Sequence, residues 1–181
     1  GELRRELSIL DEEAAACARL TEDLVAFARS GELRKTPIEI DTLVGETVDR
    51  LQTSGTLGAA TLRLEVEPAR LQADRQRLRQ VLTNLLRNAV QACPNGDIEI
   101  VGRSAAHAYE LEVRDRGPGV PELDRPRVFE PFFSKRAEGS GLGLAVCLAV
   151  VRAHGGQIEI ADRDGGGAVF RVALPRSEEL P

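Results

Sequence analysis

The first 30 residues carry apolar or small side chains at alternating spacings of three and four. Such side chains lie along one side of a helix and form the seam of a coiled coil. The seam positions are Leu3, Leu7, Leu10, Ala14, Cys17, Thr21, Leu24 and Ala28. The pattern predicts one long helix over residues 2–30, ending in a linker at Ser30-Gly31 and Pro37. Because soluble monomers rarely expose such a stripe, we expect this helix to pair with a second copy or to fold back on its own domain.

Beyond residue 36 the pattern alternates between the spacing of strands and that of helices. Helices are expected at about residues 42–53, 75–93 and 141–154, and strands at 38–40, 61–67, 98–101, 109–113, 158–160 and 169–172. Asp41 and Asp74 are candidate N-caps, and Gly155 is a candidate C-cap. Helices interspersed with strands favour an α+β fold, a two-layer α/β sandwich over residues 36–176, preceded by a helical unit over residues 1–31.

The amino-acid composition argues against some classes of function. The chain has 24 Lys and Arg against 29 Asp and Glu, a net charge of −5, which argues against nucleic acid as the main partner. No apolar run approaches the ~20 residues that span a membrane. The three cysteines have no metal-site spacing and are expected to be reduced thiols, as in a cytoplasmic protein. Since the chain begins at Gly1 and has no Met, we expect an excised fragment, with any membrane sensor in the missing part.

Two glycine clusters bracket the irregular stretch over residues 117–140. The first is Asp115-x-Gly117-x-Gly119, and the second is Gly139-x-Gly141-x-Gly143. Glycine allows positive φ and close approach of the backbone to a ligand. The second cluster leads directly into an apolar helix, whose N-terminal amides attract phosphate. An acid at one glycine turn and a phosphate site at the other suggest a purine nucleotide, with the irregular stretch as its lid.

A polar stripe follows the predicted helix at 75–93. Its members recur every three or four residues, and they are Gln80, Asn84, Asn88 and Gln91. A solvated face is the ordinary explanation of such a stripe, but those faces usually favour Lys, Glu and Arg. Uncharged carboxamide oxygens instead suit a hard cation such as Mg²⁺ that bridges phosphates.

Together these motifs resemble a known family. Asn84-x-x-x-Asn88, Asp115-x-Gly117-x-Gly119, Phe129 to Phe133 and Gly139-x-Gly141-x-Gly143 resemble the N, G1, F and G2 boxes of sensor histidine kinases. These kinases belong to the group that includes gyrase, Hsp90 and MutL. The resemblance covers about residues 36–175 in the same order. It implies a Bergerat-type ATP-binding fold with a mixed sheet of about five strands and about three helices, and ATP and Mg²⁺ as cofactors.

The resemblance also implies roles for individual residues. Asn88 would be the Mg²⁺ ligand, and Asn84 would support the same site and act in catalysis. ATPase relatives have a water-activating Glu at the position of Asn84, and an amide cannot serve as that base. The chain therefore looks built to deliver the γ-phosphate to a side chain rather than to water.

Asp115 would accept a hydrogen bond from the adenine N6 amine, which discriminates adenine from guanine. The ordinary explanation of an Asp before such a glycine is turn chemistry. The other expected nucleotide contacts are Gly117, Gly119, Val120, Phe132, Gly139, Ser140, Gly141, Leu142, Gly143 and Leu144. In the lid, Lys135 and Arg136 are candidates to reach the γ-phosphate, as in the nitrogen-regulatory branch of these kinases. Which of the two reaches the γ-phosphate stays open. The alternative that both are solvated surface residues also stays open.

The phosphoacceptor is the part that the sequence lacks. His107 and His154 do not stand in a phosphoacceptor motif, and both are expected to be structural. The heptad helix resembles the second helix of the family's dimerisation and phosphotransfer domain, whose first helix carries the acceptor. The chain is therefore not expected to phosphorylate itself.

The resemblance implies the catalytic ATP-binding domain of a sensor histidine kinase. Its partners would be a phosphoacceptor His domain and then the receiver domain of a response regulator, in a parent protein that forms a homodimer. Two other functions remain open: a nucleotide-binding interaction module without transfer activity, and an anti-sigma-type serine kinase. Asn84 and the heptad helix argue against the serine kinase.

Overall fold

The computed structural model describes residues 14, 21, 25, 33–134 and 140–176. The elements are β1 (Thr36–Glu39), α2 (Ile40–Thr53), β2 (Thr61–Val66), β3 (Arg70–Ala73), α3 (Arg75–Ala92), β4 (Asp97–Ser104), β5 (Ala108–Arg114), α4 (Gly143–Ala153), β6 (Gln157–Asp162) and β7 (Ala168–Pro175). Ala14, Thr21 and Val25 are helical. The rest of the predicted helix over residues 2–30, including every seam position other than Ala14 and Thr21, lies outside the described residues.

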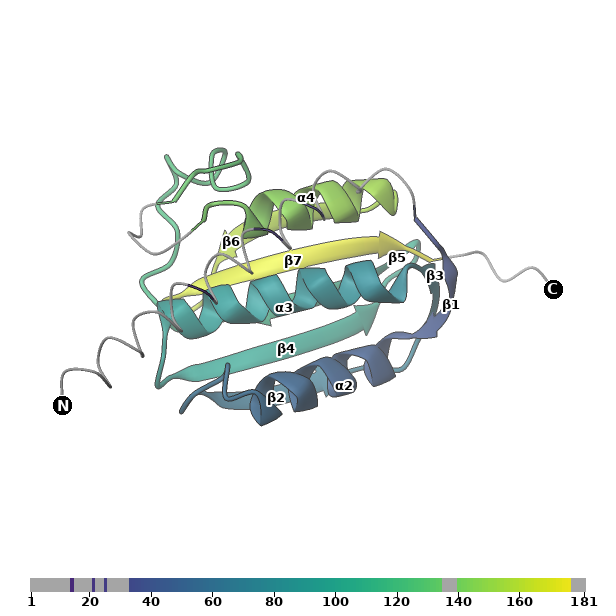
Figure 1. Cartoon of the computed structure of the whole chain (residues 1–181), viewed down its shortest axis with the longest axis horizontal. Coiled ribbons are helices and arrows are strands. Elements are labelled where there is room, and N and C mark those ends of the chain that lie inside the picture. Colours follow the sequence, from purple (N-terminus) through teal and green to yellow (C-terminus); the bar gives the residue numbers. More distant parts are fainter. Residues whose placement is uncertain (1–13, 15–20, 22–24, 26–32, 135–139, 177–181) are drawn as a thin grey trace.

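The strands form two sheets. The main sheet has the order β2-β4-β5-β7-β6, and only β2 and β4 run parallel. A two-stranded antiparallel sheet, β1-β3, closes one end of the molecule. The three helices lie side by side over one face of the main sheet, which makes two layers (Figure 1). This confirms the predicted two-layer fold with a mixed five-stranded sheet. No described helix combines the length and the apolar character that a membrane crossing requires.

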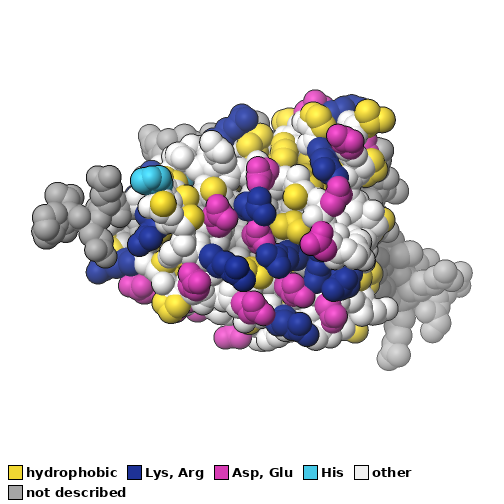
Figure 2. Space-filling view, turned by 180° about the vertical axis from the view of Figure 1, so that it is seen from behind, with side chains coloured by type: hydrophobic (Ala, Val, Ile, Leu, Met, Phe, Trp, Pro, Cys, Tyr) yellow, Lys and Arg dark blue, Asp and Glu magenta, His cyan; other side chains and the backbone are white. Residues whose placement is uncertain are grey.

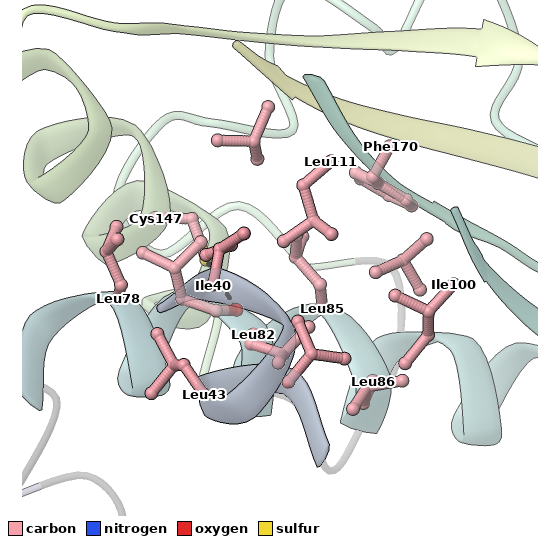
Figure 3. Packing of buried hydrophobic residues seen from close by; sticks show 14 of the residues in the cluster. Ile40, Leu43, Leu78, Leu82, Leu85, Leu86, Ile100, Leu111, Cys147 and Phe170 are labelled. Carbon is pink, nitrogen blue, oxygen red and sulfur yellow. Dashed lines mark hydrogen bonds between the residues drawn. The ribbon is translucent and has the colours of Figure 1, made fainter. Parts of the chain in front are cut away.

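The core lies between these two layers. The apolar side of α3 meets α2, α4 and the sheet (Figure 3), and Leu82, Leu85 and Leu86 are almost fully buried there. Ile100 and Phe170 face them from β4 and β7. Because α3 packs on α2, on α4 and on the sheet, its position in the fold is fixed. The side chains on its remaining surface are therefore held in fixed positions as well.

The other face of the main sheet is covered by charged side chains of both signs, interspersed in Figure 2. They form a continuous chain of ion pairs: Arg163, Glu99, Arg114, Glu112, Arg171 and Glu159. Burial acts to raise the pKa of Glu112, but hydrogen bonds from Arg171 and Arg114 outweigh it and hold that pKa below its ordinary value. The charges of this face are thus largely paired with one another.

Two local expectations about this part of the chain need correction. Strand β3 was missed, because four residues in a polar context give too short a pattern, and only pairing with β1 makes them a strand. Asp41 is not an N-cap: α2 begins at Ile40, Glu39 is its N-cap, and no side chain caps it. The start is fixed by burial of Ile40 and by its N–H, which donates to Ala69 O at 3.0 Å. Asp74, in contrast, caps α3 as predicted, accepting from the N–H groups of Gln76 and Arg77.

Candidate functional site

Asp115 lies directly after β5 and is 2% exposed. Its Oδ1 accepts hydrogen bonds from the N–H of Gly117 at 2.8 Å and of Ala168 at 3.4 Å. The turn also lies against the end of α3, because a Cβ at Gly117 would stand 2.7 Å from the Cβ of Ala92. Asp115 therefore does form the turn that ordinary Asp-Gly chemistry predicts, and it is held at the junction of α3, β5 and β7.

The β6–β7 turn supports Asp115 from the other side, which the sequence analysis missed. Gly167 has φ +112°, and a Cβ there would stand 2.0 Å from the carbonyl oxygen of Asp115. Gly119, at φ +73°, approaches the same turn: its Cβ would lie 3.1 Å from Gly167 O. The sequence signal for this contact was the run of three glycines at 165–167. A hairpin turn without any such contact explains that run equally well.

We expect Gly167→Ala to weaken nucleotide binding by displacing the backbone of Asp115. It should also lower the free energy of unfolding by about 2 kcal/mol or more, since it adds a backbone clash to the cost of positive φ. Gly166→Ala is the matched control, because Gly166 has φ +98° but no atom within 4 Å of its Cβ position. Calorimetry with ADP and thermal unfolding should separate the two variants. Equal loss of affinity in both would contradict a specific contact with Asp115.

Asn84 of α3 faces the start of α4. Asn84 is 7% exposed, and its Nδ2 donates to Gly143 O at 3.1 Å. Asn88 lies one turn further along α3 and is half-buried. A simple solvated stripe therefore does not describe Asn84, which joins the two helices. The described residues contain no cluster of His, Cys, Asp or Glu suited to a metal ion, so a cation here would need amide oxygens and the oxygens of its ligand.

The second glycine cluster shapes the start of α4. Gly141 has φ +66°, its carbonyl accepts from Phe132 N–H at 3.0 Å, and a Cβ there would stand 2.5 Å from the carbonyl carbon of Phe132. Ser140 Oγ accepts from the N–H of Leu142 at 3.2 Å. Leu142 is the N-cap of α4 and makes no side-chain cap hydrogen bond. A helix leaves its first N–H groups without partners inside the helix, and this end is thus suited to an anion.

The other predicted site residues divide into three groups. Val120 and Leu144 are partly buried and pack against the core. The ring of Phe132 is 72% exposed, and this residue, at φ +67°, meets the second glycine cluster through its backbone. Lys135, Arg136 and Gly139 lie outside the described residues. The structure therefore brings the first glycine cluster, the segment from Gly141 to Gly143 and Asn84 together at α3, which also carries Asn88, while the lid cations stay a prediction.

A hollow of about 560 Å³ opens beside Gly119 and Gly167. Its lining is Pro118, Gly119, Val120, Pro121, Glu122, Arg125, Asp162, Arg163, Gly166 and Gly167. Asp115 and the asparagines of α3 are absent from that lining, and its two cations pair with acids, Arg125 with Asp162 and Arg163 with Glu99. The hollow therefore includes Gly119 and Val120 of the expected nucleotide contacts but not Asp115, Asn84 or Asn88.

Comparison with known proteins shows the family to which the chain belongs. The family described as "Histidine kinase-, DNA gyrase B-, and HSP90-like ATPase" matches residues 73–178, more than half of the chain. Sensor histidine kinase ZraS of Escherichia coli (strain K12) is 30% identical over 178 residues, which cover 97% of this chain and 38% of ZraS. The chain thus spans well under half the length of this relative.

Two solved structures share the fold over almost the whole chain. Full-length ShkA in complex with AMPPNP gives a TM-score of 0.81 at 29% identity, covering 98% of this chain and 39% of that one. Histidine kinase ThkA in complex with response regulator protein TrrA gives 0.79 at 26% identity, covering 99% and 53%. The chain belongs to the family of histidine kinase-, DNA gyrase B- and HSP90-like ATPases, and it carries the ATP-binding catalytic domain of the sensor histidine kinase type.

Proposed function

We propose that residues 36–176 bind ATP with Mg²⁺ and transfer the γ-phosphoryl group to a His of a dimerisation and phosphotransfer domain. A response regulator Asp would then accept it, in a parent protein that is a homodimer and in which this domain is cytoplasmic. One observation carries the proposal: α3 contacts the turn of the buried acid Asp115 and also the start of α4, where backbone amides gather. The AMPPNP complex of ShkA and the TrrA complex of ThkA support the ligand and the partner class.

Each end of the site suits one end of the nucleotide. The carboxylate of Asp115 would accept from the N6 amine of adenine, with Gly117, Gly119 and Val120 against the base. The start of α4, from Ser140 to Leu144, would hold the phosphates through backbone amides. These groups are fixed by the fold before any ligand arrives, which lowers the ordering cost of binding.

Asn88 would hold Mg²⁺ through its amide oxygen, and Asn84 would support it from the adjacent turn. Mg²⁺ held there would supply positive charge that neutralises the phosphates during transfer. Asn84 has no basic atom, and its Nδ2 already donates to Gly143 O, so it cannot activate water. Transfer then breaks the bond between Pγ and the bridging oxygen, forms a bond from Pγ to a nitrogen of the acceptor His, and leaves ADP.

Catalysis of this kind depends on positioning and on neutralising charge more than on proton transfer. Lys135 and Arg136 would supply positive charge near the γ-phosphate, and either one is sufficient for the proposal. Loss of both should slow transfer with a smaller effect on ADP affinity, because ADP lacks the γ-phosphate.

Titration calorimetry with ADP and GDP in the presence of Mg²⁺ tests the nucleotide assignment. We expect ADP to bind and GDP to bind at least about 10-fold more weakly, because the O6 carbonyl of guanine would face the carboxylate of Asp115 without a proton to share. Equal affinity for the two nucleotides would contradict the role of Asp115, and no binding of either would contradict the nucleotide site itself.

A further inference from the structure

His154 joins the ends of α3 and α4 that lie away from the candidate site. It follows the last residue of α4 and is 3% exposed. Its Nδ1 lies 2.8 Å from Val150 O, and its Nε2 accepts a hydrogen bond from the N–H of Asp74 at 3.0 Å. An imidazole that accepts at Nε2 is neutral and carries its proton on Nδ1, from which it donates to Val150 O. Both ring nitrogens are therefore used by backbone groups.

The linker enters the domain at the same point. Arg34 N–H donates to Asp74 Oδ2 at 3.0 Å, and Lys35 Nζ donates to His154 O at 3.5 Å. Strand β1 begins at the next residue, and its partner β3 ends directly before Asp74. Residues 34–35 are thus held by the start of α3 and the end of α4 together, and we call the set of Arg34, Lys35, Asp74 and His154 the linker latch.

The helix pair connects this latch to the nucleotide end. Three hydrogen bonds join α3 and α4 in antiparallel order. They are Asp74 N to His154 Nε2, Cys147 Sγ to Val81 O at 3.7 Å, and Asn84 Nδ2 to Gly143 O. In Figure 1 the β1–β3 end and the segment before α4 accordingly lie at opposite ends of the pair. The linker is therefore attached at one end of the hydrogen-bonded α3–α4 pair, and the candidate site lies at the other end.

We infer that His154 controls how the linker is held: its neutral ring keeps Arg34 and Lys35 attached to the α3–α4 pair, and its protonation releases them. The inference rests on the proposed function only in taking the opposite end of the α3–α4 pair as the nucleotide site. A protonated Nε2 would be a donor facing the N–H of Asp74, which is also a donor, so the hydrogen bond that closes the latch would be lost.

The surroundings of His154 favour the neutral ring. Burial lowers its pKa below the ordinary value, and Lys35 on the linker acts in the same direction, whereas the hydrogen bond with Val150 and the charge of Asp74 oppose it. The end of β7 packs on this helix end with the uncharged Leu174 and Pro175. In the open state His154 regains an ordinary pKa of about 6.5. The closed latch is therefore at full stability above that pH, and each unit below it favours opening by up to about 10-fold, until the pH reaches the folded pKa.

Amide hydrogen exchange measured by NMR on the 181-residue chain tests the latch. The protection factor of the Arg34 amide is compared at pH 7.5 and 5.5 in the wild type, in His154→Gln and in His107→Gln. Glutamine can accept from Asp74 N–H but does not titrate, and His107 is the exposed histidine of the β4–β5 turn. We expect protection to fall, by at most about 10-fold, in the wild type and in His107→Gln, and to stay constant in His154→Gln. Equal behaviour of all three would overturn the inference.

Two further readouts keep the test decisive. Nitrogen chemical shifts of the wild-type ring at pH 7.5 should show Nδ1 protonated and Nε2 unprotonated, and the opposite tautomer would overturn the inference even if His154→Gln fails to fold. Affinity for ADP at pH 7.5 should be the same within about twofold in all three proteins. A wild type that binds no ADP would contradict the proposed function, while the Arg34 readout would still decide the latch.

Discussion

Replacing Asp115 by alanine should weaken ADP binding by about 10- to 150-fold, which makes it one of the two largest effects expected in this chain. A hydrogen bond to a charged group contributes roughly 1.5–3 kcal/mol, and the variant removes the acceptor for the adenine amine. It also removes the acceptor for the N–H groups of Gly117 and Ala168, so part of the loss would come from a less ordered turn. Calorimetry with ADP measures the effect, and Asp97→Ala at the exposed start of β4 is the control.

Asp115→Asn separates recognition from turn structure. The amide oxygen can replace Oδ1 as acceptor for Gly117 and Ala168, while the amide nitrogen replaces the other carboxylate oxygen and becomes a donor. We expect this variant to keep its fold, to lose affinity for ADP and to gain affinity for GDP relative to the wild type. An unchanged preference for ADP in Asp115→Asn would show that the base is recognised elsewhere.

Asn88→Ala should reduce phosphoryl transfer by more than about 100-fold, because it removes the proposed Mg²⁺ ligand from the phosphates. The assay supplies the chain with ATP, Mg²⁺ and a separate peptide that bears an acceptor helix with its His. Transfer in this form is slow even in the wild type, because docking is bimolecular. The wild type should bind ADP more tightly with Mg²⁺ than with a chelator, whereas Asn88→Ala should bind it equally under both conditions.

The matched control for this variant is Asn95→Ala. Asn95 is exposed in the turn after α3 and belongs to no part of the candidate site. It should keep both transfer and the effect of Mg²⁺ on ADP affinity. If Asn88→Ala behaved like this control, the metal would have to be held by other groups.

Local chemistry explains why much of this site could be predicted from the sequence. The cap at Asp74 depends on residues within three positions of each other. Asn84 and Asn88 share a face because a helix repeats every 3.6 residues. A glycine at position 141 is compatible with a positive φ, and the observed φ is +66°. The two-layer sandwich followed from the alternation of helix and strand patterns, while the mixed five-stranded sheet was implied by the family resemblance.

The missed features all depend on contacts between residues distant in sequence. Gly167 is needed because it touches the carbonyl of Asp115, 52 positions earlier. Strand β3 exists because β1 pairs with it, some 30 residues away. His154 was expected to be structural, and its burial and backbone hydrogen bonds agree, but its partner Asp74 lies 80 residues away and could not be identified from the sequence pattern. Sequence periodicity predicts each element, while pairing between elements appears only in the folded chain.

The chemical stability of the transferred label tests the central claim most directly. The chain is incubated with γ-labelled ATP, Mg²⁺ and the acceptor peptide, and the label on each protein is then exposed to acid and to base. We expect label on the peptide alone, labile in acid and stable in base, as for a phosphoramidate on His, with no appreciable ATP hydrolysis by the chain on its own. Acid-stable label would indicate a serine kinase, tight ATP binding without transfer would indicate an interaction module, and steady ATP turnover by the chain alone would contradict the role of Asn84.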